Sequence, residues 1–407
     1  MGPRVQRGRG GGLVQLERSE TIFEDGWNFI EENTFLVGKI NCSKEIMQNL
    51  LLELQRLAIR FQKLWEERCG TSGQVYFEHR VSEYREMWRA VARDLGATFN
   101  ILSEDFWELE LGDQTIRINN HQLEFDNPVT LSLAGKKPLV HLLLKQEGIA
   151  VPDFMVFRWA EFSTAYQFLD RYPNGCVIKP VDGYGGKGIT TLIQTKKECR
   201  KAAVLASLYS RDLLMEPQIP GESYRMLVIG GKMVHAVRRS GVRIVGDGEK
   251  TIAGLIMSEN NRRRREGKEV LDIDRDCLFC LKSQRLSLDA IPDKGRSVLI
   301  KSIDESSSNR AEVRTVYNED VTARLCDSIK RDAELAATIV RSEFLGVDAI
   351  MMDPSVPLKE GGGVINEVNT TPALHHHYDV QKESYPQIAL AAVSHLLRKR
   401  LADVEVW

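Results

Sequence analysis

The sequence predicts an α+β protein with two or three domains. Its 407 residues exceed the roughly 150 residues of one typical domain. After Lys136, segments rich in Val and Ile alternate with segments of helical periodicity. Glycine-rich turns join several of the apolar segments into hairpins. With 43% apolar and 28% charged residues, the composition is that of an ordinary folded domain.

Bulk charge and hydropathy exclude two classes of partner. The chain carries 55 Lys and Arg against 57 Asp and Glu, so its net charge of −2 offers no general attraction to nucleic acid. No apolar run reaches the roughly 18 residues of a membrane span, so we expect no membrane partner. Seven cysteines, an odd number, argue against a complete disulfide framework. We therefore expect a protein of the reducing cytoplasm.

The N-terminal part is predicted to be an arm followed by a helical extension, over residues 1–72. Residues 1–12 contain three arginines among glycines but no apolar stretch of a signal peptide. From Ser43 to about Gly70, apolar residues recur at three- and four-residue spacing, which predicts an amphipathic helix. This helix packs on its own domain or forms the seam of a homodimer, and the pattern leaves both alternatives open.

A small α/β region is predicted over residues 73–134. A helix is expected from Ser82 to Leu95, ended by Gly96. Extended segments follow at Thr98–Leu102, Phe106–Leu111 and Thr115–Asn119, and the pair Gly112-Asp113 between the last two is a hairpin signal. Helices are then expected at Pro138–Glu147, Ala160–Tyr172 and Lys196–Ser207.

A glycine loop between two β-branched segments, Cys176 to Ile193, is the sharpest local signal. Its spacing satisfies GxGxxG, but strand-forming residues follow where a dinucleotide site would begin a helix. Backbone N–H groups of such a loop can close over phosphate oxygens, with charge from Lys179 and Lys187. The alternative is a tight turn with solvated lysines.

A second signal lies near the C-terminus, where Gly346–Met352 and Gly363–Asn369 predict a hairpin. Asp348 faces this pair of strands, and Glu367 and Asn369 project from one side because they are two residues apart. Such oxygen ligands suit Mg²⁺. Polar residues at a strand end are the alternative reading. Between the two signals, Leu214–Arg225 leads into a further hairpin, Met226–Val237.

Three remaining clusters receive ordinary interpretations. Cys277 and Cys280 are expected to be buried thiols of a helix rather than zinc ligands. Residues 262–265, four arginines, are expected to form a solvated face. Residues 375–377, three histidines, are expected in a loop beside the substrate, with His377 making the contact, because adjacent imidazoles cannot all reach one ion.

In this order, over roughly residues 130–385, the sequence resembles the ATP-grasp ligases, closest to the branch of cyanophycin synthetase and bifunctional glutathione synthetase. The blocks that carry the resemblance are Pro220–Val228, Val245–Ile256, Leu286–Pro292 and Ile365–Pro372. The resemblance implies an ATP-grasp fold, in which two α+β subdomains clasp ATP. Residues 135–215 would form the central and lid subdomains, and 216–407 the C-terminal subdomain with the metal site.

The resemblance also implies a role for each matching residue. Lys137 and Lys179 would contact the α- and β-phosphates, and Glu216 with the Ile219 backbone would hold adenine. The family's ribose-binding acidic position is Ser223 here, so either Glu222 would substitute or the contact with the ribose would be lost. Arg225, Arg239 and Lys301 would face the substrates. The phosphate lid would comprise Gly183, Gly185, Gly186, Lys187 and Gly188, and two Mg²⁺ ions would be held by Asp348, Glu367 and Asn369.

The implied activity is the ATP-dependent joining of a carboxylate, on an amino acid or peptide, to an amine through an acyl phosphate. Two alternatives share the same nucleotide site. One is a small-molecule kinase, which stops at phosphoryl transfer to a hydroxyl group, and the other is a non-catalytic ATP-binding protein. The intact pattern of Lys179, Asp348, Glu367 and Asn369 argues against the non-catalytic alternative.

Overall fold

The computed structural model divides the chain into two compact units, Met1–Leu64 and Trp65–Trp407. It describes residues 50, 53–54, 56–57, 60, 72–158, 161–182, 188–265, 270–273, 275–301, 318–377 and 387–404. In the first unit the described residues are helical, and Arg56 pairs with Glu53 at 2.9 Å. Most of the helix predicted from Ser43 to Gly70, and the whole N-terminal arm, lie outside the described residues.

In the second unit, a long helix packs on a four-stranded antiparallel sheet. Helix α3 (Ser72–Leu95) begins before the predicted Ser82 and ends where expected. The strands β1 (Thr98–Ile101), β2 (Phe106–Leu111), β3 (Gln114–Asn119) and β4 (Gln122–Leu123) pair in order, which confirms the predicted hairpin.

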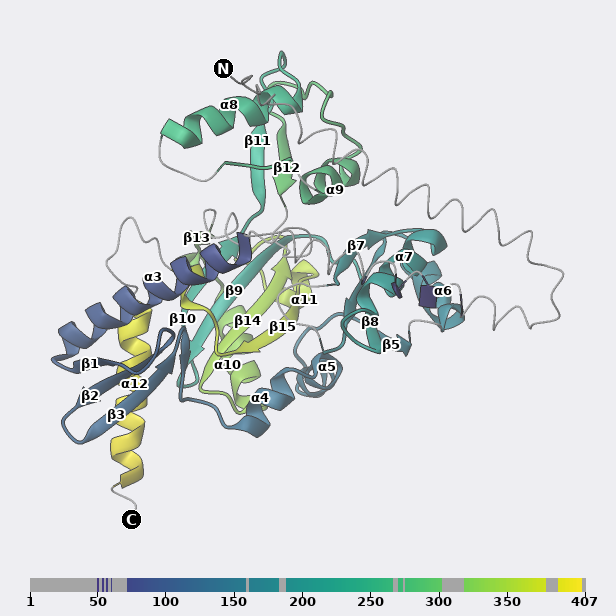
Figure 1. Ribbon diagram of the computed structural model, residues 1–407. Coiled ribbons are helices and arrows are strands. Elements are labelled where there is room, and N and C mark those ends of the chain that lie inside the picture. Colours follow the sequence, from purple (N-terminus) through teal and green to yellow (C-terminus); the bar gives the residue numbers. More distant parts are fainter. Residues whose placement is uncertain are drawn as a thin grey trace, which may run out of the picture. The chain divides into compact units, whose positions relative to one another are not determined.

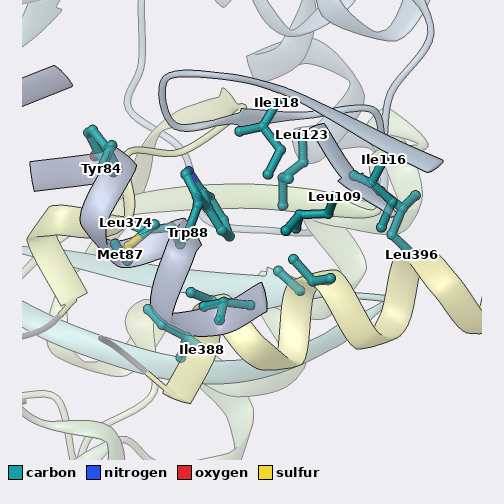
Figure 2. Packing of buried hydrophobic residues seen from close by; sticks show 14 of the residues in the cluster. Tyr84, Met87, Trp88, Leu109, Ile116, Ile118, Leu123, Leu374, Ile388 and Leu396 are labelled. Atoms are coloured by element: carbon teal, nitrogen blue, oxygen red, sulfur yellow. The ribbon is translucent and has the colours of Figure 1, made fainter. Parts of the chain in front are cut away.

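The core of this layer is apolar and joins the two ends of the second unit. Trp88 of α3 and Ile118 of β3 are fully buried, and both lie in one cluster with Ile388 and Leu396 of the C-terminal helix α12 (Gln387–Val404). Figure 2 shows these side chains between the strands and α12. The indole of Trp88 donates to the carbonyl of Asn120 at 2.8 Å, so its one polar atom is satisfied.

A five-stranded antiparallel sheet, in the order β13-β10-β9-β14-β15, is the centre of the unit (Figure 1). The predicted hairpins are confirmed, although β9 already begins at Glu222. The elements are β9 (Glu222–Ile229), β10 (Lys232–Arg239), β13 (Asn318–Asp320), β14 (Phe344–Met351) and β15 (Val364–Thr370). Helices α4 (Pro128–Ala134), α5 (Lys137–Gln146) and α10 (Asp327–Val340) contribute to the core on one face of this sheet.

A second mixed layer contains the glycine-loop hairpin. Its sheet runs β5 (Met155–Arg158), β8 (Asp212–Pro217), β6 (Cys176–Pro180) and β7 (Thr190–Ile193), and the antiparallel pairing of β6 with β7 confirms the predicted hairpin. Helices α6 (Phe162–Arg171) and α7 (Lys196–Ala206) pack against it. Thr195 and Glu198 form a reciprocal capping box that fixes the start of α7.

A small two-stranded sheet carries two further helices. Strands β11 (Val242–Val245) and β12 (Ser297–Lys301) pack with α8 (Ile252–Arg265) and α9 (Arg275–Ser283). Cys277 and Cys280 are buried in α9, as predicted. The prediction of a solvated arginine face is wrong for Arg263, which is buried and pairs with Glu259 at 3.0 Å.

Three short elements complete the described part: η2 (Thr322–Arg324), α11 (Leu358–Gly361) and η3 (Leu374–His377). The last corrects the loop predicted for the three histidines, which form a turn of 3₁₀-helix. Within the described ranges, none of the helices has the length and apolar character needed to span a bilayer.

Candidate functional site

One face of the five-stranded sheet changes from apolar to charged along its strands. Alternate residues of a strand share a face, and Leu227 and Phe344 on this face belong to the core with α12. Further along the same face lie Arg225 of β9 and Asp348 of β14, directly opposite each other in the ladder. The burial of charged groups beyond the end of the apolar core marks this end of the sheet as a candidate site.

Asp348 is held by a two-point contact with Arg225. The guanidinium donates from Nε to Oδ1 and from Nη2 to Oδ2, each at 2.7 Å. Asn369 of β15 donates to Oδ2 at 3.1 Å, and Arg239 of β10 approaches the same oxygen at 4.0 Å. Burial acts to raise the pKa of Asp348, but the charge and hydrogen bonds of Arg225 outweigh it and lower the pKa below its usual value.

Helix α5 presents two buried polar side chains to the site. Lys137 and His141 are four residues apart and so share one face of the helix. The ammonium of Lys137 lies 3.3 Å from Oε1 of Glu367 on β15. Nε2 of His141 lies 3.0 Å from the carbonyl oxygen of Asn366, to which it donates. One turn of α5 therefore contacts two consecutive residues of the strand that bears the predicted metal ligands.

A buried ion pair lies on the second sheet. Lys179 of β6 and Glu216 of β8 project from the face opposite the core residues Ile178 and Met215. Their Nζ and Oε2 atoms are 2.8 Å apart, and both side chains are almost fully buried. The two residues that the family resemblance assigns to phosphate and adenine are thus in direct contact.

His141 connects this ion pair to α5. Its Nδ1 lies 3.6 Å from Oε1 of Glu216, and neither atom has a hydrogen-bond partner within the described residues. Burial lowers the pKa of His141, so the ring is neutral and Nδ1 carries a lone pair. Sequence reasoning missed His141, although its spacing from Lys137 on an amphipathic helix could have revealed it.

The structure describes only some of the remaining predicted site residues. Gly183, Gly185, Gly186 and Lys187 lie outside the described residues, whereas Gly188 is described, with a positive φ of 76° just before β7. Ile219 lies in the segment between β8 and β9. Glu222 approaches Arg243 at 3.8 Å, Ser223 pairs with Arg239 in the ladder, and Lys301 is buried at the end of β12.

The donor set at the end of β14 and β15 suits a magnesium ion. Asp348, Glu367 and Asn369 offer carboxylate and amide oxygens, and Mg²⁺ is bound through one or two carboxylates together with phosphate oxygens and water. Asp348 and Glu367 lie opposite each other in the ladder, and Asn369 contacts Asp348. The side chains therefore fit the ion that the family resemblance implies.

The histidines of η3 lie within the electrostatic influence of Arg225 and Arg239, which help to lower the pKa values of His376 and His377. His377 is buried, and its Nδ1 is 3.1 Å from Nδ1 of His235 on β10. Burial, His235, Arg225 and Arg239 together hold the pKa of His377 well below its usual value, so the ring is neutral. His375 bonds to the hydroxyl of Tyr84 on α3, and Asn318 of β13 donates to the carbonyl of His376 at 2.9 Å. Both contacts anchor η3.

Comparison with known proteins gives relatives that bear the names suggested by the motifs. No protein-family model matches the chain. It is 31% identical over 278 residues to the cyanophycin synthetase of Crocosphaera subtropica, which covers 66% of this chain and 31% of that protein. It is 24% identical over 302 residues to a glutathione biosynthesis bifunctional protein of Listeria welshimeri, which covers 72% of this chain and 38% of that protein.

Among solved structures, the chain is similar to a bifunctional glutathione synthetase from Pasteurella multocida. The identity is 22%, the TM-score is 0.45, and the match covers 70% of this chain and 40% of that one.

The chain spans about a third of the length of the curated relatives that it matches. Those relatives are the two kinds of protein whose sequence blocks it resembles, and the mixed helix and sheet architecture agrees with the predicted α+β class. The chain is a homologue of cyanophycin synthetase and of the glutathione biosynthesis bifunctional proteins.

Proposed function

We propose that the protein joins the carboxylate of an amino acid or peptide to an amine, using ATP, and releases ADP and phosphate. The observation that carries the proposal is the convergence of Lys137, Glu367, Asp348 and Arg225 at one end of the central sheet, with the Lys179–Glu216 pair joined to them through α5. These are the positions to which the family resemblance assigns nucleotide, metal and substrate.

The nucleotide would bind by exchange of partners. Lys137 and Lys179 would leave Glu367 and Glu216 for phosphate oxygens, as point charges suited to that ligand. Glu216 would then accept from the adenine amino group, and the Ile219 backbone would contact the ring. Glu222 and Ser223 would lie at the ribose. Gly183, Gly185, Gly186, Lys187 and Gly188 would cover the phosphates and exclude water.

The two arginines would stabilise the charge that develops in the reaction. The substrate carboxylate attacks the γ-phosphate, an acyl phosphate forms, and an amine then displaces phosphate from the acyl carbon. Arg225 and Arg239 would donate to the oxygens on which negative charge grows, and Lys301 would contact a substrate. When bound through Asp348, Glu367 and Asn369, two Mg²⁺ ions would supply neutralising charge for the triphosphate.

The proposal also includes a division of the chain into subdomains. Residues 73–134 would precede the ATP-grasp module, 135–215 would form its central and lid subdomains, and 216–407 its C-terminal subdomain.

The odd cysteine count favours the cytoplasm. A homodimer through the extension within residues 1–72 completes the proposal, and sedimentation of the chain with and without those residues tests it.

The decisive experiment replaces the natural amine with hydroxylamine. Amino acids and dipeptides are screened for ATP-dependent phosphate release, and the product is identified by mass spectrometry. A ligase gives a hydroxamate with any acid that stimulates ADP formation, because hydroxylamine is a small and strong nucleophile. A Glu367→Gln variant should lose at least about 100-fold in this activity, because the metal loses a charged ligand.

Two outcomes would replace the proposal by another function. A phosphorylated hydroxyl product without hydroxamate or amide would show a small-molecule kinase. Binding of ATP without ADP formation with any acid in the screen would show a non-catalytic nucleotide-binding protein.

A further inference from the structure

Two histidines from different elements, His377 of η3 and His235 of β10, are hydrogen-bonded to each other, and His235 lies near the carboxylate of Asp320. Nδ1 of His377 on η3 contacts Nδ1 of His235 on β10 at 3.1 Å, and Nε2 of His235 lies 3.7 Å from Oδ2 of Asp320 on β13. The other nitrogen of His377, Nε2, is buried and has no hydrogen-bond partner within the described residues. A buried polar atom without a partner is costly and calls for a functional reason.

The contacts select one arrangement of protons. If His377 carries its proton on Nδ1, it donates to His235, and His235 directs its own Nε2–H towards the carboxylate of Asp320. The opposite arrangement would turn a lone pair of His235 towards that carboxylate and leave an N–H of His377 buried without an acceptor. The favoured tautomer of His377 therefore has a lone pair on Nε2.

The charged surroundings of His377 are those of the reaction site. Arg225 of β9 and Arg239 of β10 lie close enough to depress its pKa, together with burial and His235. His376, its neighbour on η3, is likewise held neutral by burial and by the same two arginines. Both arginines are charged in the absence of substrate, so they disfavour a further positive charge on the ring. An acyl phosphate bound to them would remove that opposition.

Resting on the proposed ligase function, we propose that His377 is the general base that takes the proton from the attacking amine, with His235 and Asp320 as positioning residues. An aliphatic amine is mostly an ammonium ion at neutral pH and has no lone pair for attack. Its nucleophilic nitrogen must therefore lose a proton inside the site.

An N–H bond of the ammonium breaks and its proton passes to Nε2 of His377. The electron pair left on nitrogen forms a bond to the acyl carbon, and the bond between that carbon and the phosphate oxygen breaks with its electrons on phosphate. The second proton of the amine leaves with phosphate. The imidazolium of His377 shares its Nδ1–H with His235, which in turn donates towards Asp320.

The test compares two nucleophiles in a His377→Asn variant. The amide nitrogen of Asn can replace Nδ1 and keep the contact with His235, but Asn is no base. Hydroxylamine is already neutral at pH 7.5, whereas an amino acid amine is not. With the acid and amine identified by the phosphate-release screen, amide formation should fall at least about 100-fold, while hydroxamate formation from the same acid changes less than about threefold.

The pH profile and a matched control complete this comparison. Amide formation by His377→Asn should recover as the pH rises towards the pKa of the free amine, and the wild-type rate should not show this dependence. His395→Gln on α12, a histidine that pairs with Glu343, should keep the wild-type ratio of amide to hydroxamate. Equal losses with both nucleophiles, or none with either, would overturn the inference. Absence of hydroxamate with wild-type protein would instead overturn the ligase function.

A second measurement needs no substrate. Nitrogen-15 NMR of the histidine rings in the full chain should show His377 protonated on Nδ1 and unprotonated on Nε2 at pH 7. In His235→Ala the proton should move to Nε2, because the acceptor on the other side is gone. A wild-type His377 that carries its proton on Nε2 would rule out the general base.

Discussion

At the scale of single residues, the charged groups of the site occur as pairs of opposite sign. Asp348 with Arg225, Glu367 with Lys137 and Glu216 with Lys179 each combine a carboxylate with a cation within 3.3 Å. Taking one ion of such a pair out of water without the other is strongly unfavourable. Each pair therefore determines what the removal of one partner does.

Arg225→Ala should destabilise the protein by about 3–5 kcal/mol, because it removes the charge and the two hydrogen bonds that Arg225 gives the buried Asp348. The double variant Arg225→Ala/Asp348→Asn should recover a large part of this loss, since no carboxylate then remains unpaired. Urea unfolding monitored by circular dichroism measures both values. Equal stability of the single and double variants would show that Asp348 is solvated rather than dependent on Arg225.

The sequence could predict which polar residues come together but not their partners. Two-residue spacing places Glu367 and Asn369 on one side of β15, and the hairpin brings them to Asp348. The contact of His141 with Asn366 depends on the packing of α5 against β15, which no local pattern reports. The chain of His377 and His235 joins residues 142 positions apart and was missed for the same reason.

At the scale of elements, the start of β9 depends on Gly221. Its φ of 132° is a conformation that side chains rarely adopt, and a Cβ there would lie 2.5 Å from the backbone of Met351. The close approach lets Glu222 pair with Met351 at the end of the ladder between β9 and β14. Arg225 follows in the same strand, so the turn at Gly221 also sets the position of this arginine.

Gly221→Ala should therefore cost about 3 kcal/mol or more. Gly231→Ala is the matched control, because Gly231 also has a positive φ, of 74°, but a Cβ there would meet no atom within 4 Å. We expect it to cost about 1 kcal/mol. Thermal unfolding of both variants separates steric contact from backbone strain. A loss at Gly221 no larger than that at Gly231 would contradict the role of the close approach.

Hairpins were the elements best predicted from sequence, because turn glycines and β-branched runs are local signals. The pairs β2–β3, β6–β7, β9–β10 and β14–β15 all form. The short helix η3 was predicted as a loop, since its three histidines show no apolar periodicity and its contacts with Tyr84 and Asn318 come from distant segments. The burial of Arg263 likewise depends on packing of α8 that the run of four arginines does not reveal.

At the scale of the whole molecule, buried neutral histidines make stability depend on pH. The pKa values of His141, His376 and His377 are lowered, chiefly by burial, from an ordinary value of 6.5. Below that pH the unfolded chain binds protons that the folded chain does not. The stability contributed by the neutral rings is therefore present above about pH 6.5 and is lost as the pH falls towards the folded pKa values.

We expect the free energy of unfolding to decrease between pH 7.5 and 5.5, with each histidine contributing up to about 1.4 kcal/mol per pH unit. Urea unfolding at several pH values gives the slope. His141→Gln should make the slope shallower, because up to one fewer proton is taken up on unfolding. A flat profile in wild-type protein over this range would show that the three rings already titrate in the folded state.

Two ion pairs of the site, Lys137 with Glu367 and Lys179 with Glu216, would also limit which polyanions can bind. A phosphate oxygen that bound Lys137 or Lys179 would release the carboxylate of Glu367 or Glu216, which would then lie beside the bound anion. A polyanion that arrives without its own cations would therefore exchange one attraction for a new repulsion. A nucleotide that brings divalent counter-ions would supply partners for the released carboxylates. If the proposed nucleotide site is correct, the arrangement would favour nucleotides that carry divalent cations over metal-free polyphosphates.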